Sequence, residues 1–278
     1  MALPNIDEHV VEGFGDEWTR FDQSTLSAEE VREVFDSYFS IFPWHELPPG
    51  AVGFDFGCGS ARWSRLVASR VGRLHCIDAS PAALDVARRA LAGHSNCELH
   101  LAPVDRIPLP DASADFGYSL GVLHHIPDTP AALRDCVRKL RPGAPFLVYL
   151  YYRFDNRPRW YAMLWRSTEL ARYIVSRLPH AFRYALSQLL AAAVYWPLAR
   201  LARLAERLGL DVKSFPLSFY RHRSFYVMRT DALDRFGTRL EQRFTRVEMR
   251  QMMLDAGLTD IVFSDRAPFW CAVGRRSD

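Results

Sequence analysis

The densest group of residues that could do chemistry is the glycine-rich segment Gly53-Phe54-Asp55-Phe56-Gly57-Cys58-Gly59-Ser60, which follows an apolar run and precedes a helical pattern. Glycine tolerates positive φ and close backbone approach, so Gly57 and Gly59 suit a chain that leaves a strand and enters a helix within a few residues. The amides exposed at the start of such a helix favour an electron-rich or anionic ligand. The segment therefore predicts a site for a nucleotide-like ligand.

Two common nucleotide motifs do not fit this segment. A dinucleotide-binding loop requires G-x-G-x-x-G, but Arg62 stands in place of the third glycine, and no Gly-Lys-Ser/Thr ending marks an ATP-binding loop. NAD and ATP are therefore disfavoured. Asp78 ends the next apolar run, 19 residues after Gly59, where a carboxylate accepts hydrogen bonds from ribose hydroxyls in such folds. The alternative is that Asp78 is a solvated acid that caps the helix starting at Pro81.

Apolar runs and helical patterns alternate along the chain at the spacing of β-α-β units. The alternation predicts an α/β fold with five parallel strands, completed by a further helix and two closing strands. The expected strands are 51–56, 73–77, 97–102, 115–120, 145–151, 261–264 and 269–273, and the expected helices are 61–71, 81–91, 129–140 and 245–256.

Composition and pattern divide the chain into three parts. Residues 1–50 are expected to form a helical lead-in or cap, residues 51–151 and 231–278 the sheet domain, and residues 152–230 a helical insert. The helices of the insert are expected to break at Pro179, Pro197 and Gly209. The insert holds 14 Lys/Arg against 4 Asp/Glu, and 15 of the 36 aromatic residues. Its positive charge is explained either by an anionic ligand or by codon usage that favours arginine throughout the chain.

The chain resembles the class I S-adenosylmethionine-dependent methyltransferases, in particular the small-molecule branch that includes the ubiquinone/menaquinone biosynthesis type. The resemblance covers residues 51–151 well and 245–275 more loosely. It implies a Rossmann-like, seven-stranded, mostly parallel sheet with helices on both faces, plus an inserted helical lid. The motifs that carry it are Asp55-Phe56-Gly57-Cys58-Gly59-Ser60, Asp78-Ala79-Ser80, Val104-Asp105-Arg106-Ile107-Pro108-Leu109-Pro110, Asp115-Phe116 and Leu120-Gly121-Val122-Leu123-His124-His125-Ile126-Pro127-Asp128.

The resemblance implies S-adenosyl-L-methionine as cofactor and S-adenosyl-L-homocysteine as product. The glycines would lie along the methionine part, Asp78 would hold the ribose, and Asp105 with Arg106 would flank the adenine. Ala61 stands where many members have glycine, and Trp18, in the aromatic element 14–18, has the alternative of being an ordinary packing residue. The expected cofactor-binding residues are Trp18, Asp55, Gly57, Cys58, Gly59, Asp78, Ala79, Asp105, Arg106 and Leu120.

A methyl acceptor must lose a proton, so a base is useful when the acceptor is a hydroxyl, and histidine, with a pKa of about 6.5, is the usual choice. His124 and His125 follow the fourth strand, at the edge where open sheets bind ligands, and His222 lies in the insert. These three are the candidate catalytic residues. The pair is also a common loop sequence in family members that need no base. The loop offers no oxygen cage for magnesium, so no metal is expected.

The expected acceptor is a small, partly apolar metabolite that can carry an anionic group, methylated on oxygen or carbon ahead of nitrogen. Leu120-Gly121-Val122-Leu123 replaces the D/N-P-P-Y segment of adenine and glutamine N-methyltransferases. The insert is expected to close over cofactor and acceptor as a lid, with Tyr220, Arg221, Arg223 and Tyr226 as substrate-binding residues. Alternatively, its aromatic residues are the core of a small helical subdomain.

Other partners and rival functions stay open. No nucleic acid is expected, because the insert mixes arginine with apolar helix faces instead of showing a stacking module. Residues 186–207 either touch an anionic membrane surface or are buried within the lid. An enzyme that uses the sulfonium electrostatically for cyclisation, decarboxylation or hydroxylation is the main alternative, and a binding protein with a degenerate site is the third. Five cysteines without a C-x-x-C pair, and an N-terminus lacking signal-peptide features, predict a cytoplasmic protein.

Overall fold

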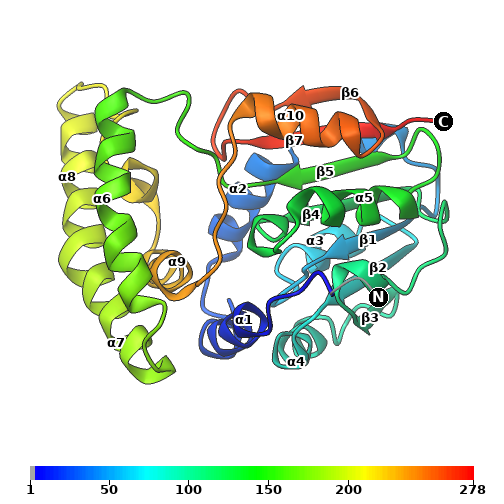
Figure 1. Cartoon of the computed structure of the whole chain (residues 1–278), viewed down its shortest axis with the longest axis horizontal. Coiled ribbons are helices and arrows are strands. Elements are labelled where there is room, and N and C mark those ends of the chain that lie inside the picture. Colours follow the sequence, from blue (N-terminus) through cyan, green and yellow to red (C-terminus); the bar gives the residue numbers. More distant parts are fainter. Residues whose placement is uncertain (1–3) are drawn as a thin grey trace. The chain divides into compact units, whose positions relative to one another are not determined.

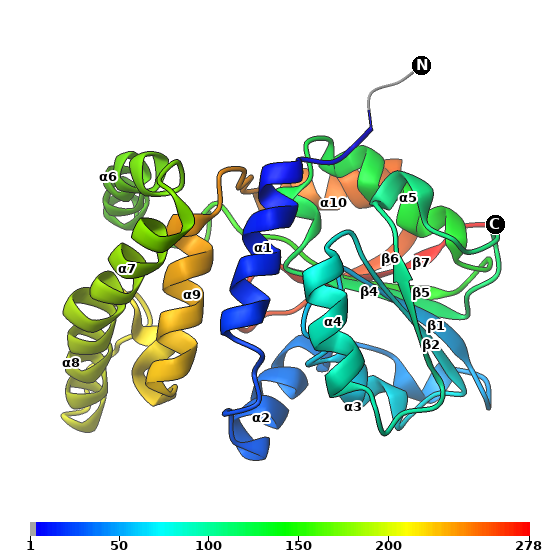
Figure 2. The same ribbon diagram turned by 90° about the horizontal axis from the view of Figure 1, so that it is seen from below.

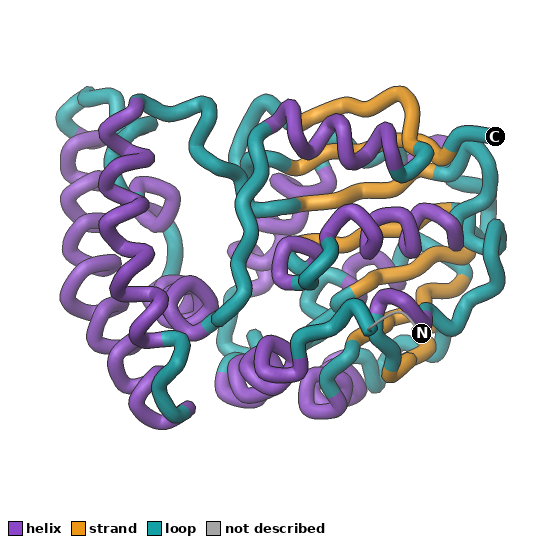
Figure 3. The backbone as a smooth tube through the Cα atoms, in the orientation of Figure 1, coloured by secondary structure: helices purple, strands orange, loops and turns teal. Residues whose placement is uncertain are grey.

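The computed structural model describes residues 4–278, which divide into two compact units. The sheet unit comprises residues 4–23, 31–153 and 240–278, and the helical unit comprises residues 24–30 and 154–239. Their elements are labelled in Figures 1 and 2. All the strands among the described residues belong to the sheet unit, and Figure 3 separates them from helices and loops by colour.

The sheet has seven strands in the order β3-β2-β1-β4-β5-β7-β6. Neighbouring strands are parallel except where β7 pairs with β5 and β6, which confirms the expected mostly parallel α/β sheet. The strand order reverses between β1 and β4, and open sheets of this kind bind ligands at the carboxyl ends of the strands beside such a point. The strands are β1 (Val52–Phe56), β2 (Arg73–Asp78), β3 (Cys97–Leu101), β4 (Phe116–Leu120), β5 (Pro145–Tyr149), β6 (Leu258–Phe263) and β7 (Cys271–Arg276).

Helices cover both faces of the sheet. α5 (Thr129–Lys139) and α10 (Arg246–Asp255) lie on one face, and α3 (Ser64–Ala68) and α4 (Pro81–Ala90) lie on the other (Figure 2). α3 is shorter than the expected helix 61–71 at both ends, and the loop before it keeps a positive φ as far as Ala61. The remaining elements of this part of the chain are α1 (Glu8–Arg20), α2 (Ala28–Phe39), η1 (Trp44–Glu46), η2 (Val104–Arg106) and η3 (Leu123–His125).

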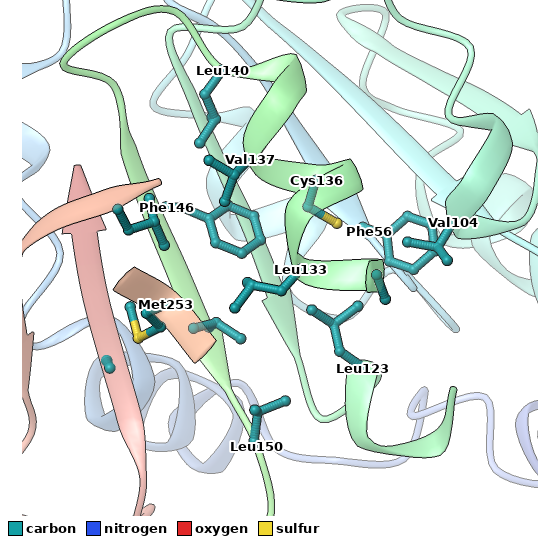
Figure 4. Packing of buried hydrophobic residues seen from close by; sticks show 14 of the residues in the cluster. Phe56, Val104, Leu123, Leu133, Cys136, Val137, Leu140, Phe146, Leu150 and Met253 are labelled. Atoms are coloured by element: carbon teal, nitrogen blue, oxygen red, sulfur yellow. The ribbon is translucent and has the colours of Figure 1, made fainter. Parts of the chain in front are cut away.

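The core on the α5 face holds the carboxyl edge of the sheet in place. Leu133 and Val137 of α5 pack with Phe146 of β5 and Met253 of α10, and all four side chains are buried (Figure 4). Leu123 joins the same cluster directly before the two histidines of η3. Truncating a fully buried leucine or methionine of this kind to alanine typically costs about 2–5 kcal/mol. The loop that carries the histidines is therefore anchored in well-packed core.

The helical unit has a core of its own, formed by buried side chains of three helical segments and of the last helix of the unit. Val175, Tyr195 and Met228 belong to this core. The expected insert boundary at residue 230 falls inside α9, which packs on α6 and α7, and the unit continues to residue 239. Its helices are α6 (Arg159–Val175), α7 (His180–Leu190), η4 (Ala191–Tyr195), α8 (Trp196–Arg207), η5 (Ser218–His222) and α9 (Phe225–Gly237).

Helical backbone runs without interruption from His180 to Arg207, so the break expected at Pro197 is wrong. The segment η4 is a π-helix and Pro197 lies in the first turn of α8. A π-turn frees a backbone carbonyl from its usual partner, which lets a proline without an N–H enter a continuing helix. The breaks expected at Pro179 and Gly209 are present, since Pro179 caps α7 and Gly209, at φ +80°, follows α8.

The chain leaves the sheet unit after Arg153 and returns to it at Leu240. Within the sheet unit, Tyr152 and Phe244 form an isolated parallel bridge, so the outgoing and returning segments lie side by side. A search of the helices among residues 4–278 finds none whose length and apolar character would let it cross a membrane.

Candidate active site

The loop after β1 has the geometry that its glycines predict. Gly57 and Gly59 have φ of +75° and +53°, and the amides of Gly57 and Cys58 donate to the carbonyl of Ile77 at 2.7 and 3.1 Å. A Cβ on Gly57 would lie 2.3 Å from the side chain of Val122. Ala61 also has a positive φ, +59°, although it is not glycine. The loop is thus fixed against the ends of β2 and β4 and leaves no room for a side chain at Gly57.

Asp78 lies at the carboxyl end of β2 and faces this loop. Its Oδ2 accepts from the Gly59 amide at 2.9 Å, and its Oδ1 accepts from the Ser80 amide at 2.8 Å. Burial raises the pKa of the Asp78 carboxyl, while the backbone amides of Ser80, Gly59 and Ala79 oppose that rise. Each carboxylate oxygen has a second acceptor position, so two hydroxyl donors can still bind. This arrangement fits a ribose. It also differs from the alternative role of Asp78, a solvated acid that only caps α4.

Asp55 supports the loop from within the sheet. Ser64 Oγ of α3 donates to Asp55 Oδ2 at 2.6 Å, and the side chain is buried. Burial raises the pKa of Asp55 to about 7, partly opposed by the hydrogen bonds that its carboxyl accepts, and the charge of Asp78 adds to the rise. Two neighbouring acids held at raised pKa values favour a ligand with positive charge. Burial likewise raises the pKa of the Cys58 thiol, which is therefore neutral.

Asp105 Oδ1 in η2 and Ser60 Oγ in the glycine loop are buried and have no hydrogen-bond partner among the described residues. A buried acceptor without a donor is costly unless a ligand supplies one. An exocyclic amino group such as that of adenine is a donor of the required kind. Arg106 beside it is exposed, and Leu120 is the last residue of β4.

Helix α1 lies against the glycine loop. A Cβ on Gly59 would lie 2.8 Å from the indole of Trp18, and one on Gly15 would lie 2.7 Å from Ser80 Oγ. The guanidinium of Arg62 is 5.8 Å from the centre of the Trp18 ring. The aromatic element at residues 14–18, which includes the expected cofactor-binding residue Trp18, therefore lies beside the glycine loop.

The two histidines after β4 differ in their surroundings. His125 Nδ1 lies 2.7 Å from the Leu240 carbonyl, to which it donates, so the lone pair of the neutral ring is on Nε2. Its ring also contacts Phe14 of α1, with ring centres 4.9 Å apart. His124 is fully buried, and neither of its ring nitrogens has a hydrogen-bond partner among residues 4–278. Burial lowers the pKa of His124 well below its usual value, so this ring is neutral.

Three tyrosines next to these histidines were not singled out from the sequence. The ring centre of Tyr151 is 3.9 Å from that of His124, Tyr149 is 5.8 Å from Tyr151, and Tyr38 of α2 is 5.1 Å from Tyr149. The run Tyr149-Leu150-Tyr151 was interpreted only as the end of a strand. The position of Tyr149 and Tyr151 at the carboxyl end of a parallel strand is the sequence feature that would have indicated these two residues.

The residues expected to bind substrate have partners inside the helical unit. Glu206 accepts hydrogen bonds from both Arg221 Nε, at 2.9 Å, and His222 Nε2, at 2.6 Å. Tyr220 donates its hydroxyl hydrogen to Asp231 at 2.8 Å. The guanidinium of Arg223 is 5.5 Å from the centre of the Phe219 ring, and the Tyr226 carbonyl accepts from Thr230. The acceptor-binding role of these residues, and the base role of His222, stay predictions.

Residues 54–148 match the family described as methyltransferase domain. This part of the chain is similar to the class I S-adenosylmethionine-dependent methyltransferases. It contains the glycine loop, Asp78, Asp105 and both histidines, and S-adenosylmethionine is its cofactor.

Relatives of the methyltransferase domain are similar to this chain over only part of their length. The malonyl-[acyl-carrier protein] O-methyltransferase of Serratia marcescens is 38% identical over 36% of this chain and 38% of its own length. The 2-phytyl-1,4-naphtoquinone methyltransferase of Thermosynechococcus vestitus is 33% identical over 44% of this chain and 58% of its own length. The chain thus spans less than two thirds of these relatives.

A chain in the solved complex of the Haloferax volcanii Trm112 methyltransferase activator shares the fold. It has a TM-score of 0.55 and 16% identity, and the likeness covers 97% of this chain and 98% of that one. At this identity the likeness concerns the fold alone.

Proposed function

We propose that the protein transfers the methyl group of S-adenosylmethionine to an oxygen or carbon atom of a small, partly apolar acceptor that can carry an anionic group, without a metal. The observation that carries the proposal is one edge of the sheet, where Asp78 keeps acceptor capacity beside the glycine loop and Asp105 Oδ1 has no donor within residues 4–278. When bound there, the cofactor supplies an electrophilic methyl group on a sulfonium.

The residues at this edge have separable roles in the proposal. Asp78 accepts from the ribose hydroxyls, and Asp105 accepts from the adenine amino group. The loop Gly57–Gly59 lies along the methionine part, and glycine at both positions lets the loop pack against Val122 and against Trp18, which covers it from α1. The raised pKa of Asp55 leaves this acid ready to ionise when positive charge arrives above it.

For the acceptor's proton we propose His125. The Leu240 carbonyl fixes its tautomer, so Nε2 presents a lone pair that can take a proton as the methyl group bonds to the acceptor. His124 is a positioning residue, because its neutral ring contacts both His125 and Tyr151, with ring centres 4.0 and 3.9 Å away. His222 is engaged by Glu206 and is the weaker candidate.

The two curated relatives are named for O-methylation of a malonyl thioester carrier and for methylation of a phytylated quinone. They support an acceptor with acidic O–H or C–H character and do not identify it. We keep the helical unit as the acceptor lid, with Tyr220, Arg221, Arg223 and Tyr226 as its binding residues. Non-methylating use of the sulfonium is the alternative, and product mass separates the two, because only methyl transfer adds a methylene equivalent to the acceptor.

The first test is calorimetric titration with S-adenosylhomocysteine. Loss of the charged hydrogen bonds in Asp78→Ala should weaken binding by about tenfold or more, whereas Asp85→Ala should leave it unchanged. Asp85 is the matched control because it is an exposed acid on α4 that pairs with Arg88. Absence of saturable binding by the unaltered protein would overturn the proposal. An untargeted mass-spectrometric screen with labelled S-adenosylmethionine then identifies the acceptor.

A further inference from the structure

The helical run from α7 through η4 to α8 has an unusual surface. Every exposed residue between 181 and 204 is alanine, phenylalanine, leucine, valine or tryptophan. Phe182 is 66% exposed and Leu189 is 62% exposed. A solvent-facing helix normally carries charged and polar residues on its outer face, so this run presents apolar surface where a solvated helix would not.

Helix α6 presents a second apolar stripe. Met163 and Leu170 are 70% and 68% exposed, and Trp160, Leu164 and Ile174 are exposed as well. Of the 21 large hydrophobic residues that are exposed among the described residues, 17 fall between Trp160 and Phe225. Single exposed hydrophobic residues need no explanation, but a concentration of this kind marks a binding surface.

The exposed charges around the same helices are of one sign. The exposed charged residues of α6, α7 and α8 are Arg159, Arg166 and Arg207, and the exposed Arg177 lies in the turn between α6 and α7. The two acids of these helices are held in ion pairs, Glu169 with Arg172 and Arg235, and Glu206 with Arg221 and His222. Arg177 precedes the apolar run 181–204 and Arg207 follows it, so the positive charges lie at its ends.

We infer that the exposed face of α6, α7, η4 and α8, hereafter the apolar face, docks on an anionic lipid membrane. Apolar side chains in the middle of a helix fit the boundary between headgroups and acyl chains, and flanking arginines fit anionic headgroups at the same depth. Charge complementarity selects this occupant, because neither a second copy of the same positive face nor a neutral apolar surface would match the arginines. The inference does not depend on the proposed methyl transfer.

The test is flotation of the full-length protein with two kinds of vesicle, phosphatidylcholine alone and phosphatidylcholine with phosphatidylglycerol. We expect binding to the anionic vesicles, reduced at high salt. The double variant Phe182→Ser/Leu189→Ser should lose this binding, and so should Arg177→Glu/Arg207→Glu. Val247→Ser is the matched control, because Val247 is an exposed apolar residue of α10 in the sheet unit and its loss should change nothing.

Folding of the variants is checked by S-adenosylhomocysteine affinity and circular dichroism, neither of which involves the apolar face. No binding to anionic vesicles at low salt overturns the inference, as does equal binding by the Phe182→Ser/Leu189→Ser variant. A drop in oligomer size for that variant, measured by light scattering without vesicles, would assign the apolar face to a contact between copies and would equally overturn it.

An independent observation concerns the strand edge of the sheet unit. His75 of β2 stands in register with Glu98 of β3, and His100 follows two residues later, so all three side chains are on one face of the sheet. His75 Nδ1 is 3.0 Å from His100 Nε2 and 3.4 Å from Glu98 Oε2, and the last two atoms are 4.0 Å apart. Arg73 lies 3.4 Å from the other oxygen of Glu98.

These three separations suit one small cation. Four ligands at the Zn–N and Zn–O lengths of a tetrahedral site are about 3.3 Å apart, close to the distances observed. Two imidazoles and one carboxylate are a frequent zinc donor set, with the fourth position left for water.

The geometry points to a Zn²⁺ site formed by His75, Glu98 and His100, separate from the methyl-transfer edge, for which no metal is expected. Because β3 is the outermost strand of the sheet, a metal held there would link it to β2. A metal ion that binds the folded state and not the unfolded state raises the melting temperature of the protein.

Thermal melting of the full-length protein with and without added Zn²⁺ tests this site. Zinc should raise the melting temperature of the unaltered protein and of the control His94→Ala, whose histidine lies outside the cluster, but not that of His100→Ala. Co²⁺ should give the intense visible absorption of a four-coordinate ion in the first two proteins only. An equal response from His100→Ala, or no response at all, would show that the two rings merely hydrogen-bond to one another.

Discussion

At the residue scale, the site is organised by acids whose surroundings are incomplete without a ligand. Asp78 is held by two backbone amides, whereas Asp55 is buried and keeps a pKa of about 7. Asp105 keeps one oxygen without a donor among the described residues. A cationic ligand with hydroxyl and amino donors would relieve all three conditions, and this is the chemical character of the cofactor.

The free energy of unfolding of the ligand-free protein should depend on pH through Asp55. Its pKa rises from 3.8 to about 7 on folding, so the folded state binds this proton more tightly than the unfolded state. The resulting stabilisation is complete below pH 3.8 and is lost as the pH rises through about 7. Urea unfolding at pH 5 and pH 8 should show this loss in the unaltered protein and a smaller one in Asp55→Asn. An identical pH dependence in both proteins contradicts the prediction.

Removal of His125 should affect turnover and spare cofactor binding. Loss of a general base typically lowers kcat by about 10² to 10⁴, so we expect a fall in that range for His125→Ala with the identified acceptor. The affinity for S-adenosylhomocysteine should stay within twofold of that of the unaltered protein. This corresponds to a change in binding free energy of about 0.4 kcal/mol at most. His45→Ala is the control, because His45 is an exposed histidine of the same unit. Unchanged turnover by His125→Ala would exclude it as the base.

Sequence patterns predicted those site residues whose role depends on local spacing. The glycine loop, Asp78 and the histidine pair all follow strands, and their positions follow from strand ends alone. The partners of Arg221 and His222 were not predictable, because Glu206 is 15 and 16 residues away on another helix. The sequence could not show that Asp105 Oδ1 has no donor in the described part of the chain, since an unpaired atom is a property of packing.

At the element scale, the turn between β1 and α3 packs closely against Val122. This packing is possible because Gly57 has no side chain. Gly57→Ala should therefore lower the melting temperature and the affinity for S-adenosylhomocysteine. Gly143→Ala is the matched control, because Gly143 has a φ of +76° but open space around its Cβ position, so its cost is only the backbone term of about 1–2 kcal/mol. Adding Val122→Ala should restore part of what Gly57→Ala loses. Equal losses for Gly57→Ala and Gly143→Ala would show that the contact with Val122 is unimportant.

The same scale explains which elements were predicted well. Strands β1 to β5 lie within two residues of their expected limits, since each is a short apolar run bounded by turn signals. The closing strands β6 and β7 are displaced from their expected positions by two to three residues at several ends. The uninterrupted helix through Pro197 was missed because a π-turn leaves no mark in composition.

At the scale of the whole molecule, the two units have separate cores and should respond separately to damage. Met228 is fully buried in the core of the helical unit, and Met228→Ala should cost that unit about 2–5 kcal/mol. Hydrogen exchange should then quicken in α6 to α9 while the amides of β1, β2 and β4 keep their protection. S-adenosylhomocysteine affinity should be retained. Quickened exchange in the strands to the same extent would mean that the units unfold as one.

The parallel bridge between Tyr152 and Phe244 has an evolutionary consequence. Because the outgoing and returning segments are neighbours on the sheet unit, an insertion, deletion or replacement of everything between Arg153 and Leu240 requires no rethreading of the strands. Recombination at these two points could exchange one helical module for another while the cofactor site is inherited intact. A lineage could in this way acquire new methyl acceptors, or a new subcellular location, in a single genetic event.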